Sequence, residues 1–96
     1  MLFAIGDVHG HFEKLTHLMG HCRRLADAAE EQARFILLGD YVDRGPESNL
    51  VLEFLASRPP DVLAISGNHE DLMLRAYDNP DDADLWYANG GLETLV

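Results

Sequence analysis

Short apolar runs alternate along this chain with longer stretches in which apolar residues recur every three or four positions. The runs at 2–5, 33–38 and 61–66 are apolar almost throughout, and a glycine directly follows each of them. Such runs predict buried strands, whereas spacing by three or four predicts amphipathic helices. The pattern therefore predicts three strands that are separated by helices.

The predicted helices follow the strands in turn. The first covers residues 12 to about 31, and the second begins at Pro46 and ends at the Pro-Pro pair of residues 59 and 60. A third ends before residue 79, and a fourth runs from about 81 to 89. The apolar stripe of the first helix consists of Phe12, Leu15, Met19, Cys22, Ala26 and Ala29.

The predicted order is β-α-β-α-β-α-α, which indicates an α/β fold with a parallel sheet flanked by helices. Strands that are apolar throughout are typical of a sheet covered on both faces. Ligands of such sheets bind beyond the carboxyl ends of the strands. A chain of 96 residues makes one domain, or part of one.

Polar residues gather at the predicted carboxyl ends of all three strands. The segments are GDVHG at 6–10, GDYVDRGP at 39–46 and GNHE at 67–70. Carboxylates, imidazoles and an amide are suitable ligands for divalent metal ions. The candidate metal ligands are Asp7, His9, Asp40 and Asn68, with Asp40 able to bridge two ions through its two oxygens.

Three further residues in these segments suit the hydrolysis of a phosphoester. Arg44 offers a planar fork of donors to phosphate oxygens, and Asn68 is a second candidate for contact with the substrate. His69 could protonate the leaving alkoxide, and Asp43 could orient its imidazole. Each segment alone is equally consistent with a turn, a surface ion pair or a helix cap. The three in order, each after an apolar strand, predict metal-assisted attack on phosphate.

The three segments resemble the N-terminal motifs of the phosphoprotein phosphatase family, within the calcineurin-like metallophosphoesterases. The resemblance implies that Asp7 and His9 bind one metal, that Asp40 bridges and that Asn68 binds a second ion. It further implies phosphate contact by Arg44 and an acid pair formed by His69 and Asp43. The segment WYANGGLETL at 86–95 also resembles the compact bacterial members.

The family also places two metal-binding histidines and a second phosphate-contacting arginine in a C-terminal half. No histidine follows His69 in this sequence, and the only later arginine is Arg75. We therefore expect residues 1–96 to be the N-terminal part of a metallophosphoesterase domain. Of the two divalent ions of a complete enzyme, this chain is expected to bind at most one well.

The leading functional hypothesis is a phosphomonoester hydrolase similar to bacterial serine/threonine protein phosphatases, in which a metal-bound hydroxide attacks phosphate directly. A hydrolase of dinucleoside polyphosphates is the alternative enzyme, although that branch tends to carry Asp at the position of Glu70. A catalytically incomplete fragment that binds metal or phosphate is a third hypothesis. Manganese is the preferred metal, with iron, zinc or nickel as alternatives.

The composition of the chain limits the classes of molecule that it is expected to bind. The net charge of −10 disfavours nucleic acid and anionic lipid, and no stretch approaches the ~20 apolar residues of a membrane span. A phosphorylated protein or a small phosphoester is the expected partner. The single cysteine and the absence of a signal-like start favour the cytoplasm. Apolar residues at the C-terminal end, Leu92, Leu95 and Val96, favour self-association.

Several other residues that could be mistaken for site residues are expected to have structural roles. His17 and His21 are spaced to share a zinc ion, but they lie opposite the apolar stripe and have no evident third ligand. Cys22 lies on the stripe and is predicted to be buried and inert. Glu70 is expected to cap a helix or support the site, and Trp86 is assigned to the core.

Overall fold

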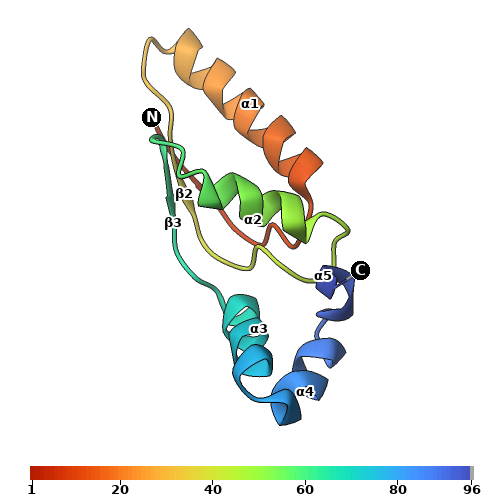
Figure 1. Cartoon of the computed structure of the whole chain (residues 1–96). Coiled ribbons are helices and arrows are strands. Elements are labelled where there is room, and N and C mark those ends of the chain that lie inside the picture. Colours follow the sequence, from red (N-terminus) through yellow and green to blue (C-terminus); the bar gives the residue numbers. More distant parts are fainter. Residues whose placement is uncertain (96) are drawn as a thin grey trace.

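A computed structural model of the chain, which describes residues 1–95, contains a three-stranded sheet and flanking helices (Figure 1). Strands β1 (Leu2–Ile5), β2 (Arg34–Leu37) and β3 (Val62–Ala64) are parallel and lie in the order β1-β2-β3. The predicted α/β class and the parallel sheet are confirmed. The third strand is shorter than the predicted run of 61–66.

The helices follow the predicted order, with small differences at their ends. The first ends at Ala28 rather than near residue 31, and a short helix that the pattern did not assign follows Gly91. The helical elements are α1 (Phe12–Ala28), α2 (Ser48–Ala56), α3 (Asn68–Asp78), the 3-10 turn η1 (Pro80–Asp82), α4 (Ala83–Ala88) and α5 (Leu92–Leu95).

The core lies between the sheet and helices α1 and α2, which both cover the same face (Figure 1). Alternate strand residues such as Ile5, Phe35 and Leu37 enter this core, together with Met19 of α1 and Val51 of α2. The strands are added in one direction, and right-handed connections then place each crossover helix on the same side of the sheet.

The opposite face of the sheet is open in the described part of the chain. Leu2 is 65 % exposed and Leu63 is 62 % exposed, and both project from strands of the sheet. The expectation that helices cover both faces was therefore wrong for residues 1–95. Apolar composition identified the strands, but the strand order decides which face receives the helices.

Helices α3 and α4 lie beyond the carboxyl end of the sheet rather than on either face (Figure 1). They pack on each other and on η1, and they extend the molecule to 51 × 19 × 19 Å. No helix among residues 1–95 is long and apolar enough to cross a membrane. At the C-terminal end of the chain, Leu92 and Leu95 are exposed, while Val96 lies outside the described residues. Self-association through this end stays a prediction.

Candidate metal and phosphate site

The loops after β2 and β3 touch each other at two glycines. Gly39 has a φ of +100°, and a Cβ atom there would lie 2.5 Å from the nitrogen of Gly67. A Cβ atom on Gly67 would in turn lie 2.5 Å from the Oδ1 atom of Asp40. Only glycine allows this approach. The two residues therefore let the loops that carry Asp40 and Asn68 meet.

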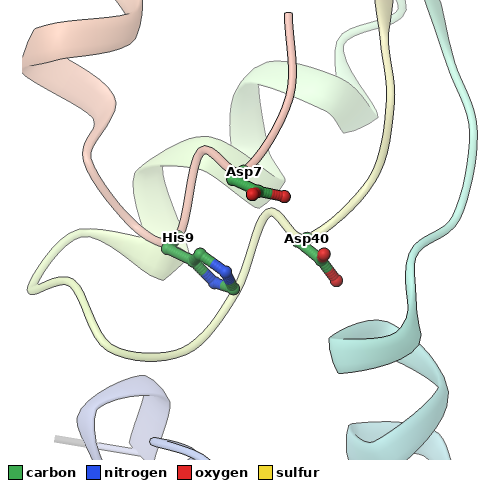
Figure 2. Close-up of side chains that lie close together, drawn as sticks. All are labelled: Asp7, His9 and Asp40. Atoms are coloured by element: carbon green, nitrogen blue, oxygen red, sulfur yellow. The ribbon is translucent and has the colours of Figure 1, made fainter.

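Asp7, His9 and Asp40 form a cluster that we call the metal cluster (Figure 2). Each offers one ligand atom, and these atoms all lie within 4.8 Å of one another. Asp7 and His9 come from the loop after β1, and Asp40 comes from the loop after β2. Two carboxylates and an imidazole at this spacing suit a divalent cation.

The backbone holds the cluster in an unusual conformation. Asp7, His9 and Asp40 have φ values of 53°, 42° and 56°, in the left-handed region that non-glycine residues rarely adopt. The backbone N–H of His9 donates to the Asp40 carbonyl at 2.8 Å and joins the two loops. Such strain costs about 1–3 kcal/mol per residue and is concentrated at functional sites.

The imidazole of His9 is oriented by a hydrogen bond on one side of its ring. Its Nδ1–H donates to the carbonyl of Val42 at 2.9 Å. This bond fixes the tautomer and leaves Nε2 free to bind a metal ion. A backbone acceptor of this kind is a usual partner of metal-binding histidines.

Asn68 lies against the same carboxylate. One terminal amide atom of Asn68 is 2.9 and 3.1 Å from the two Asp40 oxygens. An amide nitrogen at that position donates to both oxygens, whereas an amide oxygen there would share a cation with them. Asp40 Oδ1 also accepts the backbone N–H of His69 at 3.0 Å, at the start of α3. Asp40 is therefore held from two sides.

Asp43 and His69 form a buried pair next to the metal cluster. The Nδ1–H of His69 donates to Asp43 Oδ2 at 2.9 Å, and the two side chains are 6 % and 0 % exposed. The His69 ring also contacts the His9 ring edge-on, with centroids 4.5 Å apart. The structure thus brings together the residues predicted for metal binding and those predicted for proton donation.

Arg44 is the predicted residue with the least defined place. It is exposed, and its backbone N–H donates to the Gly90 carbonyl at 3.0 Å. It directly follows Asp43 and has a φ of 69°. Contact of its guanidinium with phosphate stays a prediction.

Glu70 caps α3 and also supports the site, which are the two roles expected of it. The residue is 8 % exposed, and its carboxylate accepts backbone N–H groups from both loops. The donors are Asp40 at 2.7 Å, Tyr41 at 2.8 Å, Val42 at 3.2 Å and Gly67 at 2.9 Å. A glutamate three residues after the helix cap was the only sequence signal, and it indicated the bond to Gly67 alone.

Tyr41 connects the same two parts of the chain near the carboxyl ends of β2 and β3. Its hydroxyl donates to the carbonyls of Leu37 at 2.9 Å and Ile65 at 2.5 Å. Burial raises the pKa of the Tyr41 hydroxyl, and the nearby Glu70 carboxylate adds to this increase. The hydroxyl therefore keeps its proton and remains a donor at neutral pH.

Trp86 and Thr94 were not predicted to touch the site. The indole Nε1–H of Trp86 donates to both Asp43 oxygens at 2.8 Å, and the Thr94 hydroxyl donates to Asp43 Oδ1 at 2.7 Å. Trp86 is buried, as expected of a core residue, but it also has this polar contact. Sequence separations of 43 and 51 residues leave no local signal for either bond.

The remaining histidines lie outside the metal cluster. His17 and His21 are exposed on α1. His11 lines a cavity of about 160 Å³ together with Asp7 and Lys14. Cys22 is buried, as predicted.

Comparison with known proteins identifies the family. The family model described as calcineurin-like phosphoesterase matches residues 2–95. Serine/threonine-protein phosphatase 1 of Salmonella typhimurium is 34 % identical over 90 residues, which are 94 % of this chain and 38 % of that protein. The symmetrical bis(5'-nucleosyl)-tetraphosphatase of Dechloromonas aromatica is 38 % identical over 72 residues, 75 % of this chain and 25 % of that protein.

A third relative, the zinc-dependent endopolyphosphatase of Saccharomyces cerevisiae, is 35 % identical over 77 residues, 80 % of this chain and 23 % of that protein. The chain thus spans about a quarter to two fifths of the length of these relatives. The resemblance of the three loop segments is confirmed over nearly the whole sequence. This chain belongs to the calcineurin-like phosphoesterase family, whose members depend on divalent metal ions.

Proposed function

We propose that this chain is the metal-binding part of a phosphomonoester hydrolase that acts like a serine/threonine protein phosphatase. The observation that supports this best is the contact between the metal cluster and the Asp43–His69 pair, made by the rings of His9 and His69 at 4.5 Å. A phosphoester bound at the cluster would have its leaving oxygen within reach of an acid. Hydrolysis needs both parts in one place.

The chain's own residues would bind the divalent ions through oxygen and nitrogen atoms. Asp7, His9 and Asp40 are the proposed ligands of one ion, and Asp40 with Asn68 would hold part of the shell of a second. A divalent cation at such a site polarises the phosphate and lowers the pKa of bound water, which supplies a nucleophile near neutral pH. Manganese is the proposed metal.

His69 is the proposed general acid. Its Nδ1–H is bound by Asp43, so Nε2 is the atom that would give a proton to the leaving alkoxide. The carboxylate keeps the imidazole in one orientation and compensates its positive charge. Arg44 and Asn68 are proposed to contact the phosphate oxygens, where charge increases during the reaction.

A phosphorylated protein is the proposed substrate, in the cytoplasm. The similarity to the Salmonella protein phosphatase extends over 94 % of this chain, whereas the similarity to the Dechloromonas tetraphosphatase extends over 75 %. Dinucleoside polyphosphate hydrolysis is the second candidate, because the 38 % identity to the tetraphosphatase is the higher of the two.

Turnover of three substrates tests the proposal. A phosphoserine peptide, p-nitrophenyl phosphate and diadenosine tetraphosphate are compared with Mn²⁺ present, and the first two should be hydrolysed. Cleavage of diadenosine tetraphosphate alone would favour the second candidate. Asp71→Asn is the control for loss of a carboxylate outside the site, and its turnover should equal that of the wild type. Asp71 is exposed and pairs with Arg75 on α3.

Calorimetric titration with Mn²⁺ tests the third hypothesis, an incomplete fragment. We expect one ion to bind to the metal cluster and Asp7→Asn to remove that binding. One weakly bound ion without turnover of any substrate would identify residues 1–96 as a fragment that binds metal and lacks activity by itself. Two tightly bound ions per chain would require ligands beyond those named above.

A further inference from the structure

The Asp43 carboxylate receives hydrogen bonds from three separate parts of the chain. His69 of α3 donates to Oδ2, Thr94 of α5 donates to Oδ1, and the Trp86 indole of α4 donates to both oxygens. The Asp43 side chain is completely buried. A buried carboxylate is costly unless such donors compensate its charge. The three donors therefore account for a charged group at this position.

The Thr94 hydroxyl contacts the backbone of Asp43 as well as its carboxylate. The Thr94 hydroxyl oxygen accepts the Asp43 N–H at 2.8 Å while its own proton goes to Asp43 Oδ1. Ser48 Oγ is 3.2 Å from both the Asp43 nitrogen and the Thr94 oxygen, so its hydroxyl can donate to Thr94. One hydroxyl thus determines the position of both ends of Asp43, whose backbone has a φ of 74°.

The indole of Trp86 has little freedom to turn away. A Cβ atom on Gly91 would lie 2.5 Å from ring atoms of Trp86, so the glycine backbone is packed against the ring. Trp86 as a whole is 6 % exposed. Ordinary core packing would place the indole here, but it would not require Nε1 to lie at equal distances from both carboxylate oxygens. The polar contact is a separate feature.

We propose that Trp86 and Thr94 are positioning residues for proton donation by His69. This inference rests on the proposed phosphoesterase function. Trp86 and Thr94 occupy Oδ1 and one side of Oδ2, which leaves the remaining side of Oδ2 for His69 Nδ1. Rotation of the carboxylate would break the hydrogen bonds from both Trp86 and Thr94. The imidazole is therefore held in one plane, with Nε2 free beside the metal cluster.

The chain allows variants that remove single donors. Trp86→Phe keeps a buried aromatic ring and removes the N–H, and Thr94→Val keeps the shape and removes the O–H. Thr94→Ser retains the hydroxyl and should behave like the wild type. Tyr87→Phe is the control for an aromatic change nearby, because Tyr87 packs on Trp86 with ring centroids 5.7 Å apart.

Leaving-group dependence separates positioning from general loss of structure. Phenyl phosphate needs a proton on its leaving oxygen more than p-nitrophenyl phosphate does. We expect Trp86→Phe and Thr94→Val to lower kcat for phenyl phosphate about tenfold, a part of the 10²–10⁴-fold that general acids supply, with less than about threefold loss for p-nitrophenyl phosphate and KM unchanged. Equal losses on both substrates would overturn the proposal.

A second measurement needs no activity, so it distinguishes failure of this inference from failure of the proposed function. The chain has one tryptophan, and its indole N–H gives a single signal in a ¹⁵N–¹H spectrum. We expect this proton to exchange slowly with solvent and its signal to shift in Asp43→Asn and Thr94→Val but not in Thr94→Ser.

The ring nitrogens of His69 complete the test. Their ¹⁵N shifts report which nitrogens carry a proton. We expect Nδ1 to be protonated in both the charged and the neutral ring of the wild type, because Asp43 accepts that proton, and we expect the neutral ring to be a mixture of tautomers in Trp86→Phe. A fast-exchanging indole proton, or an unchanged tautomer in Trp86→Phe, would overturn the inference. If the wild type hydrolyses no phosphoester but the spectra behave as expected, the positioning stands and the proposed activity of this chain does not.

Discussion

The metal cluster and the Asp43–His69 pair lie side by side, yet they are stabilised in different ways. The pair is buried, and donors from α3, α4 and α5 compensate the charge of Asp43. The metal cluster brings the carboxylates of Asp7 and Asp40 together with a single imidazole, and Asp7 is exposed. Like charges at this distance repel, so a cation would compensate what the chain does not.

This contrast separates two kinds of site residue. One kind is held in place by the fold, as Asp43 is. The other lies on left-handed loops and includes two carboxylates, Asp7 and Asp40, whose negative charges a bound cation would compensate. We expect perturbations of the two regions to have separable effects.

The largest expected effect is on the metal cluster. In the complete protein, Asp40→Asn should reduce hydrolysis below detection, because it removes the proposed bridging charge. The fold should persist, because the Asn oxygen can still accept the His69 N–H. Turnover is measured beside circular dichroism and the Trp86 indole signal, which should not move. Retained activity in this variant would refute the bridging role of Asp40.

The conformation of the loop after β2, which carries both Asp40 and Asp43, depends on Glu70. Glu70→Gln should lower the free energy of unfolding by about 3 kcal/mol, because a charged acceptor of four N–H groups becomes a neutral amide that also presents donors to them. Urea denaturation measures the change. Glu53→Gln, an exposed change on α2, is the matched control and should change the stability by less than about 0.5 kcal/mol. Equal effects of the two variants would contradict the role assigned to Glu70.

Bound metal should raise the free energy of unfolding through the metal cluster and not through the Asp43–His69 pair. Mn²⁺ at a hundred times its dissociation constant should raise the free energy of unfolding by about 2.7 kcal/mol, and chelation should reverse this. Thermal unfolding with and without the ion measures the gain. Asp7→Asn should abolish it, whereas Trp86→Phe should leave it intact. Stabilisation that survives in Asp7→Asn would place the ion elsewhere.

The smallest effect is expected below the site. Tyr41→Phe removes the donor to the Leu37 and Ile65 carbonyls and should cost about 1–2 kcal/mol of stability. Metal affinity should change little, because Glu70 still holds the Asp40 loop. Parallel urea and Mn²⁺ titrations check both statements. A large loss of Mn²⁺ affinity would show that Tyr41 contributes to the geometry of the metal cluster.

Much of the site was predictable because local pattern and strand direction suffice for it. Asp7, His9 and Asp40 each follow an apolar strand, and parallel strands bring their carboxyl ends to one edge. Asp43 was predicted to orient the imidazole of His69, and the structure places the two side chains 2.9 Å apart.

Other contacts had no signal in the sequence. Glu70 was expected to cap its helix or support the site, but its bonds to three N–H groups of a loop about 30 residues earlier had no local signal. The open face of the sheet was unexpected as well. Apolar periodicity describes a strand by itself, whereas coverage depends on the order in which strands are added.

The sequence by itself determined the three strands, the intervening helices and the glycine-flanked segments that carry the candidate ligands. These follow from local preferences and from the period of the apolar residues. Only the tertiary structure decided which donors surround Asp43. Trp86 and Thr94 reach it through the packing of α4 and α5, and contacts between residues 43 and 51 positions apart depend on the whole fold rather than on any local pattern.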